Sequence, residues 1–295
     1  MSLKHVVVGG GTGFIGKRLI DLLGQQGITS TIVSRKSGRN KISWTDVECN
    51  GLPKDTSAVV NVAGQNVLDP TKRWTSEFKK IVRDSRVKTT EVLTKAVANT
   101  DAKAFVTISG VAYYKPNDTT YTEECKCEPY DFLSELCRDW EAAAQLPEGS
   151  KTRQVIIRSG VVLGKGGGMV KQIYWPFLFG FGGPIGTGKQ YVPWIHITDL
   201  VNMFLFAMKN DNVYGILNGV APELVTNKEF TKAFASALRR PAFIPVPSFI
   251  LNIIFSKERA KMMLEGQKVL PKRAKELGFQ YQYPDINSAC KEIVR

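Results

Sequence analysis

The chain has 295 residues, of which 43% are hydrophobic, so it can bury a large core and is neither disordered nor fibrous. No apolar run reaches eighteen residues, and the nearest one, 244–255, contains two prolines, so we expect no membrane span and no membrane partner. The formal charge of +13 is compatible with binding to nucleic acid or to an anionic ligand. Because Lys and Arg are spread along the chain without an RNA-binding signature, we expect no nucleic acid.

Cysteine and histidine usage bears on the compartment and on metals. The five cysteines are odd in number and scattered, which favours a reducing compartment over a disulfide framework. The two histidines, His5 and His196, cannot build a metal site, so we predict none. The first predicted strand follows the N-terminus almost at once and leaves no room for a signal or transit peptide. This predicts a cytoplasmic protein, with the mitochondrial matrix as the alternative.

The N-terminal residues predict a strand, a tight turn and a helix. A β-branched run at 6–8 is typical of a buried parallel strand, and apolar residues at helical spacing follow from residue 15. The glycines between them form G-x-x-G-x-x-G. The first permits the turn, the second lets a pyrophosphate approach the backbone, and the third allows close packing of the helix. Glycines also end ordinary strands, but this position favours a dinucleotide site at Gly10, Thr12, Gly13, Phe14 and Ile15.

The end of the second predicted strand, 30–34, indicates which dinucleotide is preferred. An acidic residue there would bind the ribose hydroxyls of NAD. This chain instead has Ser34, Arg35 and Lys36, a hydroxyl followed by two cations that can bind a 2′-phosphate. The alternative is that both cations are ordinary loop charges. We predict NADP(H) as the cofactor.

Further strands and helices alternate along the chain. Small residues end the predicted strand 58–64, so Ala63 and Gly64 should line the cofactor, because ligands bind at the carboxyl ends of parallel strands. Glycine-rich loops at 164–168 and 180–188 should surround a pocket. The other predicted elements are a short strand at 41–44, helices at 76–98, 134–146 and 229–238, and strands at 104–110, 154–158 and 216–222.

Several motifs resemble the extended short-chain dehydrogenase/reductases. They are the glycine turn, Ser-Gly-Val-Ala-Tyr-Tyr at 109–114, Arg-Ser-Gly-Val-Val-Leu-Gly at 158–164 and Trp-Ile-His-Ile-Thr-Asp-Leu at 194–200. Gly-Gly-Pro-Ile-Gly at 182–186 and Leu-Glu-Gly-Gln-Lys-Val-Leu-Pro at 264–271 are similar to the atypical "epimerase family protein" subgroup, which is NAD-dependent epimerase/dehydratase-like with a C-terminal domain of unknown function. The resemblance implies an α/β fold, with a doubly wound parallel Rossmann sheet in 1–164, to which 196–221 returns. A smaller C-terminal substrate domain would comprise 165–195 and 222–295.

The resemblance also implies a catalytic apparatus, of which this chain retains one part. The hydride-transferring relatives use a Ser or Thr after the fifth strand together with Tyr-x-x-x-Lys on the next helix. Ser109 matches the first position and is the candidate catalytic residue, although it could simply satisfy strand-end amides. Glu141 resembles the Glu that lies four residues beyond the family lysine, so the lysine position falls on Cys137. The tyrosine position, four residues earlier, falls on Leu133. The dyad is therefore missing.

Two arginines are further candidates for cofactor binding. Arg86 replaces an Asn that faces the active site in the family, so it could meet a pyrophosphate or the substrate; the alternative is an exposed helix charge. Arg158 ends a buried strand and requires an anionic or carbonyl partner. Tyr113 and Tyr114 are more typical of an aromatic core or pocket wall than of a catalytic phenol. We interpret His196 as a core histidine with satisfied hydrogen bonds.

These observations predict an NADP(H)-binding protein of the short-chain dehydrogenase/reductase type. One hypothesis is an oxidoreductase or nucleotide-sugar-epimerase-like enzyme in which Ser109 polarises an unknown small molecule. The other is a catalytically silent NADP(H)-binding sensor or scaffold protein, which the missing dyad favours. A homodimer through the helix at 76–98 stays open.

Overall fold

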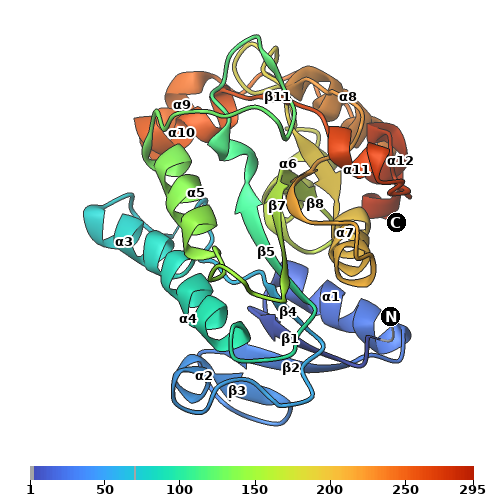
Figure 1. The fold of residues 1–295 in the computed structure, drawn as a ribbon. Helices are drawn as coiled ribbons and strands as arrows, with labels where there is room; N and C mark the ends of the chain where they lie inside the picture. The colour runs from blue at the N-terminus through green and yellow to red at the C-terminus, as the bar shows by residue number, and fades with distance from the viewer. Residues whose placement is uncertain (1–2, 70) are drawn as a thin grey trace.

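A parallel β-sheet forms the centre of the computed structural model, which describes residues 3–69 and 71–295 (Figure 1). Across these residues the sheet has seven strands in the order β3-β2-β1-β4-β5-β7-β10, and every neighbouring pair is parallel. This confirms the doubly wound α/β fold. The strands are β1 (His5–Gly9), β2 (Thr29–Ser34), β3 (Lys41–Ser43), β4 (Ala58–Asn61), β5 (Ala104–Gly110), β7 (Arg153–Ser159) and β10 (Gly215–Gly219).

Helices cover both faces of the sheet, which explains why its central strands are continuous apolar runs. The side chains of Val6, Val7 and Val8 are fully buried, because successive residues point to opposite faces and each face has a helical layer. Figure 1 shows α1 (Phe14–Gln25) and α7 (Ile197–Lys209) on one face. The other face is covered by α2 (Trp44–Asn50), α4 (Val87–Val97) and α5 (Phe132–Ala143).

The predicted helix at 76–98 is wrong in one respect, because it is interrupted at Ser85 and Arg86. The chain forms α3 (Ser76–Asp84) and then α4, and Arg86 between them has a φ of −112° and a ψ of −60°. The hydroxyl of Ser85 donates to Val82 O over 2.8 Å and accepts from Gln65 N over 2.9 Å. These local bonds compete with the helical ones. The apolar periodicity continues through the break, so it gave no sign of it.

Two predicted strands are shorter than expected. The segment 41–44 ends at Ser43, because Ser43 and Asp46 form a capping box that starts α2 at Trp44. The strand predicted at 58–64 ends at Asn61, whose side chain accepts a hydrogen bond from Ala63 N over 3.1 Å and turns the backbone away from the sheet. Ala63 and Gly64 therefore belong to the loop that follows β4.

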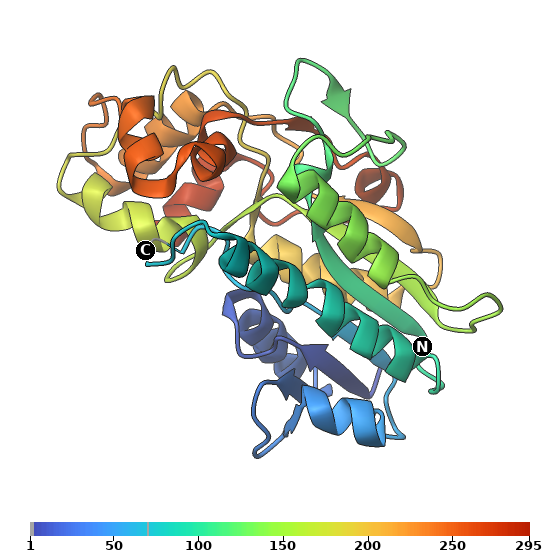
Figure 2. The same cartoon turned by 90° about the vertical axis from the view of Figure 1, so that its left-hand side faces the viewer.

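A second lobe lies at the end of the sheet where the strands terminate, and Figure 2 shows its helices gathered beside the sheet. Its core contains Phe177, Trp194, Phe234 and Cys290. The lobe consists of β8 (Val161–Leu163), β9 (Trp194–His196), α6 (Gly168–Leu178), α8 (Asn227–Leu238), α9 (Ser248–Phe255), α10 (Lys257–Leu264) and α12 (Ile286–Val294). Among the described residues, no helix is both long and apolar enough to cross a membrane.

Short elements connect the two lobes. The small sheet of β6 (Thr120–Tyr121) and β11 (Lys268–Val269) lies beyond η1 (Val111–Tyr113), and α11 (Lys272–Glu276) follows β11. Ala274 and Phe279 pack into the core of the large sheet rather than into the second lobe. The division into 1–164 with 196–221, and 165–195 with 222–295, stays a prediction as a whole.

Candidate dinucleotide site

The glycine turn joins β1 to α1 and lies against the chain that leaves β4. Gly10 has a φ of 77°, and a β-carbon there would lie 2.6 Å from the Cα of Ala63, so a larger residue does not fit. Gly13 N donates to Gly10 O over 3.0 Å and closes the turn. A side chain at Gly16 would collide with the carbonyl of Gly10. The three glycines therefore bring the first turn of α1 directly onto this loop.

The start of α1 offers backbone donors to an anion. Within the described chain no side chain caps this helix, and its first turn contains no acidic residue. The first bond of helical spacing runs from Lys17 N to Gly13 O, so the amides of the three preceding residues have no partner inside the helix. Amides of this kind, together with the helix dipole, bind phosphate groups. The residues present therefore fit the pyrophosphate of a dinucleotide.

Ser34, Arg35 and Lys36 lie beside the glycine turn because β2 pairs with β1. Gly10 N donates to the carbonyl of Val33, the residue before Ser34, over 3.0 Å. Ser34 Oγ donates to Lys36 O over 2.8 Å and holds the turn that follows the strand. The side chains of Arg35 and Lys36 are exposed. Two exposed cations next to a dinucleotide turn suit the 2′-phosphate of NADP(H).

Arg86 lies against the loop after β4. A β-carbon at Gly64 would lie 3.1 Å from Arg86 Cζ, so the guanidinium rests directly on this glycine. Arg86 Nη1 donates to Val82 O over 3.1 Å, and Arg86 Cζ lies 5.2 Å from the centre of the Trp140 ring. The side chain is half-buried, so Arg86 is not an exposed helix charge. Its contact with Gly64 places it next to the glycine turn through Ala63.

The guanidinium of Arg86 is a cation without an anionic partner. In residues 3–69 and 71–295 its contacts are a carbonyl, a hydroxyl and an indole ring, not a carboxylate. Burial lowers the pKa of Arg86 to about 10. Because a desolvated cation is costly when unpaired, this position suits an anionic ligand.

Ser109, Glu141 and Arg158 form a buried polar cluster at the ends of β5 and β7. Ser109 and Arg158 are register partners on these strands, and Ser109 Oγ donates to Glu141 Oε1 over 2.9 Å. Arg158 donates to both oxygens of the Glu141 carboxylate, from Nε over 2.8 Å and from Nη2 over 2.7 Å. Glu141 is thus the anionic partner that a buried Arg158 requires. Contact between Arg158 and a cofactor stays a prediction.

Two tyrosines enclose the guanidinium of Arg158. Arg158 Nη1 donates to Tyr114 Oη over 3.0 Å, and Arg158 Cζ lies 3.4 Å from the centre of the Tyr113 ring. Burial disfavours the charged form of Arg158, but its bonds to Glu141 and Tyr114 raise its pKa above the usual range. Burial raises the pKa of Tyr114 to about 12. Tyr114 is fully buried and stacks on Tyr121, so it is a core residue, as the sequence indicates.

The positions of the missing dyad lie on α5, close to Ser109. Cys137 is buried, and a β-carbon at Gly110 would lie 3.4 Å from its Sγ. Burial raises the pKa of Cys137 to about 12, so the thiol is neutral at physiological pH. The other position holds the half-buried aliphatic side chain of Leu133. Neither residue can exchange a proton with a substrate.

Two further features support the arrangement. A side chain at Gly167 would collide with the ring of Phe14, so the glycine-rich loop 164–168 packs on the start of α1.

His196 is fully buried; its Nε2 lies 2.8 Å from Glu292 Oε2, and its Nδ1 accepts from Thr198 N. This confirms His196 as a core histidine with satisfied hydrogen bonds, not a base of the site.

Asn61 is a positioning residue that sequence reasoning missed. It is fully buried; its Oδ1 accepts from Ala63 N, and its Nδ2 donates to Thr90 Oγ1 over 2.9 Å. Trp140 Nε1 donates to the same hydroxyl over 2.9 Å. These bonds fix the loop after β4 relative to α4 and α5. The available signal was an amide at the end of an otherwise apolar strand, where a buried polar group requires partners.

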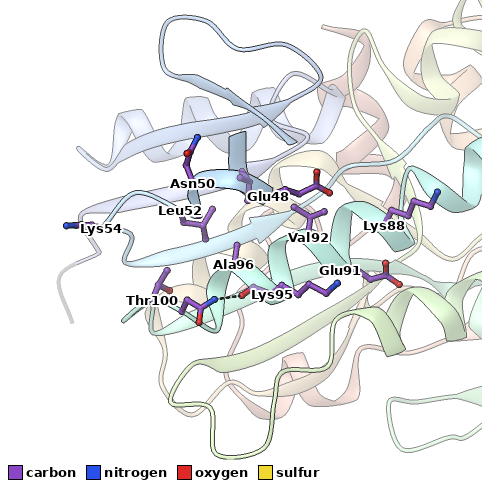
Figure 3. Close-up of a pocket in the computed structure, with 13 residues that line it drawn as sticks. Glu48, Asn50, Leu52, Lys54, Lys88, Glu91, Val92, Lys95, Ala96 and Thr100 are labelled. Carbon is purple, nitrogen blue, oxygen red and sulfur yellow. Dashed lines mark hydrogen bonds between the residues drawn. The ribbon is translucent and has the colours of Figure 1, made fainter. Parts of the chain in front are cut away.

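A separate hollow of about 720 Å³ lies between α2 and α4 (Figure 3). Its lining includes charged side chains of both signs, such as Glu48, Lys54 and Lys95. None of the residues predicted for the dinucleotide site lines it, so it is not that site. The described part of the chain also contains no group of three or more His, Cys, Asp or Glu residues that could hold a metal ion.

Comparison with known proteins identifies the family. A family model described as NAD dependent epimerase/dehydratase family matches residues 6–218, and a model for a domain of unknown function, DUF1731, matches residues 246–293. The chain belongs to the NAD-dependent epimerase/dehydratase family. Human epimerase family protein SDR39U1 is 49% identical over 293 residues, covering 98% of this chain and 99% of the relative. A homologue from Arabidopsis thaliana, described as chloroplastic, is 36% identical over 100% of this chain and 88% of its own length.

Solved structures agree with this assignment. The crystal structure of human SDR39U1 (isoform 2) with NADPH has a TM-score of 0.96 and 49% identity, and covers 98% of each chain. A nucleoside-diphosphate sugar epimerase from Corynebacterium glutamicum has a TM-score of 0.79 and 26% identity, with 100% of this chain and 59% of that chain covered. The resemblance to the epimerase family protein subgroup is therefore confirmed, and the predicted NADP(H) agrees with the NADPH bound by the human relative.

Proposed function

We propose that this chain binds NADPH, with its pyrophosphate at the glycine turn and its 2′-phosphate at Ser34, Arg35 and Lys36. The observation that carries this proposal is the uncapped start of α1 next to two exposed cations. The NADPH named for the human relative supports the choice of cofactor. When bound, NADPH supplies a hydride. The compartment stays the sequence-based prediction of cytoplasm, with the mitochondrial matrix as the alternative.

The reaction we propose is reduction or oxidation of a small molecule at Ser109. The hydroxyl proton of Ser109 is directed at Glu141, so its oxygen lone pairs can accept a hydrogen bond from a substrate hydroxyl. In the oxidation direction, the proton leaving that substrate hydroxyl passes to Ser109 while the proton of Ser109 passes to the Glu141 carboxylate, which releases it to solvent. In the reduction direction, Glu141 first takes a proton from solvent, and the same relay then protonates the carbonyl oxygen. Arg86, which contacts no carboxylate among the described residues, is placed to bind an anionic group of cofactor or substrate.

A silent NADPH-binding sensor or scaffold is the second candidate function. The observation that favours it is the pair of residues at the dyad positions, an aliphatic Leu133 and a neutral Cys137. A protein of this type would bind NADPH without turnover. The two candidates therefore differ in catalysis and agree on binding.

The variant Arg35→Ala should remove the preference for NADPH over NADH. We expect the wild type to bind NADPH at least about tenfold more tightly than NADH, and Arg35→Ala to lose that ratio while keeping its affinity for NADH. Arg39→Ala is the matched control, because Arg39 is also exposed and follows in the same loop. Calorimetric titration with both nucleotides measures the ratio. If both variants lose the preference for NADPH equally, the overall positive charge of the loop, and not Arg35 in particular, selects the 2′-phosphate.

The variant Ser109→Ala separates binding from chemistry. We expect NADPH affinity to stay within about twofold, while NADPH oxidation with a panel of aldehydes and ketones falls by at least about a hundredfold, as for the loss of a proton-transferring group. Val106→Ala, on the same strand, is the control for repacking of β5. If the wild type binds NADPH but oxidises it with no compound of the panel, the silent sensor replaces the enzyme. Unchanged turnover in Ser109→Ala would remove Ser109 from the mechanism.

A further inference from the structure

One side of the second lobe exposes a cluster of large apolar side chains, termed here the apolar surface. It comprises the exposed side chains of 175–181, at the end of α6 and in the loop after it, and of 243–254, which includes α9. In the described part of the chain, nine of the eleven exposed large hydrophobic residues belong to it. Phe243 is 76% exposed and Ile253 is 79% exposed. Surfaces of this kind in monomers are typically sites of interaction.

The two segments lie next to each other, because hydrogen bonds connect each of them to a residue that flanks the other. Arg240 Nε donates to Leu178 O over 2.8 Å, and Val246 N donates to Pro184 O over 2.9 Å. Trp175 and Phe179, one helical turn apart, stack with their ring centres 6.0 Å apart. The apolar side chains of α6 and α9 therefore belong to a single face of the lobe.

Helix α9 is held on its inner side, so its exposed face does not result from a detached helix. Leu251 of α9 is buried. The following helix, α10, is fixed by Arg259, which is buried and donates to Lys72 O and Asp69 O over 2.7 Å each. Lys79 and Glu258 form an ion pair beside this contact. The α9 part of the apolar surface thus lies on helices that are anchored to the rest of the fold.

The charges within the two stretches that carry the apolar surface are all positive, and the adjacent Glu258 is neutralised by its ion pair with Lys79. The sequence contains no Asp or Glu from 149 to 198 or from 230 to 257, the two stretches that carry the surface. Exposed cations flank it: Lys171 lies one turn before Trp175 in α6, Arg239 and Arg240 precede Phe243, and Lys257 follows α9. A second copy of this chain, with a charge of +13, would bring like charges together. An anionic partner is favoured instead.

We propose that the apolar surface binds anionic phospholipid membranes, with α9 and the end of α6 inserted at the interface. Apolar side chains with Phe and Trp, bordered by Lys and Arg, are the composition of interfacial helices, which lie in the membrane surface without crossing it. The sequence-based expectation of no membrane partner followed from the absence of a spanning segment, which interfacial contact does not require. This inference is independent of the proposed reaction.

Co-sedimentation with lipid vesicles tests the proposal on the full chain. We expect the wild type to bind vesicles of phosphatidylcholine with about 30% phosphatidylglycerol at least about tenfold more tightly than vesicles of phosphatidylcholine alone, and more weakly at high salt. Phe243→Ser with Ile253→Ser should reduce that binding at least about tenfold. Tyr214→Ser is the control, because Tyr214 is also exposed but precedes β10, outside the apolar surface. Thermal melting and NADPH titration verify that each variant is folded.

Lys257→Glu gives an independent test that leaves every apolar side chain in place, and it should weaken binding to the anionic vesicles alone. Three results would overturn the proposal. They are failure of the wild type to bind anionic vesicles, equal binding to neutral vesicles, and a wild-type dimer in sedimentation velocity that the double serine variant converts to monomer. The last result would assign the surface to a second copy of the chain.

Discussion

Glu141→Gln should destabilise the protein by about 3–5 kcal/mol, the usual cost of leaving one member of a buried ion pair without its partner. The Arg158 side chain is 5% exposed and that of Glu141 is 11% exposed, so solvent cannot replace the lost carboxylate. Gln retains the shape and an acceptor for Ser109, which restricts the change to the charge. Urea unfolding followed by circular dichroism measures the difference in the free energy of unfolding.

Asp139→Asn is the matched control for this prediction. Asp139 lies on the same helix and pairs with Arg83, but this pair is at the surface, so we expect at most about 1 kcal/mol. The double variant Glu141→Gln with Arg158→Met should be more stable than Glu141→Gln alone, because it buries no unpaired charge. If Glu141→Gln lowers the free energy of unfolding no more than Asp139→Asn does, Glu141 does not stabilise the buried charge of Arg158.

Gly10→Ala should abolish measurable NADPH binding and destabilise the fold. Alanine at a φ of 77° is strained by about 1–3 kcal/mol, and its β-carbon would also meet the backbone of Ala63. Relief of this contact moves the glycine turn away from the loop after β4, so the amides of α1 no longer face the pyrophosphate. Calorimetric titration with NADPH and thermal melting measure the two effects.

Gly24→Ala is the matched control for Gly10→Ala, and we expect it to have the opposite effect on stability. Gly24 lies inside α1, and a β-carbon there would meet nothing within 4 Å. Alanine should stabilise the helix by about 0.5–1 kcal/mol and leave NADPH affinity unchanged. If Gly10→Ala binds NADPH as tightly as Gly24→Ala, the glycine turn does not hold the cofactor.

The sequence predicts those parts of the fold that depend on neighbouring residues. The apolar run of β1, the glycine turn and the helix after it are local patterns, and the structure has them where expected. The break at Ser85 and Arg86 was not predictable, because it depends on a hydrogen bond that the Ser85 hydroxyl accepts from Gln65 N, twenty residues away. Periodicity reports which face is buried and not where helical bonds are interrupted.

The candidate site was likewise predictable only where residues close together in the sequence determine it. The sequence indicates that a buried Arg158 needs a partner, but the partner, Glu141, and its bond to Ser109 follow from the packing of α5 against β5 and β7. The apolar surface was also missed, since a segment such as 248–255 is normally read as core. Its exposure depends on how α10 packs. The position of α10 is fixed by the bonds from Arg259 to the carbonyls of Lys72 and Asp69, which are distant in the sequence.

A crystal structure of this chain grown with NADPH tests the central claim most directly. We expect density for the pyrophosphate at the amides of Phe14 and Ile15, and for the 2′-phosphate between Ser34 and Arg35. We also expect the nicotinamide end on the side of Ser109. Density for the nucleotide elsewhere, or none at saturating NADPH, would contradict the account and leave the glycine turn as an architectural element only.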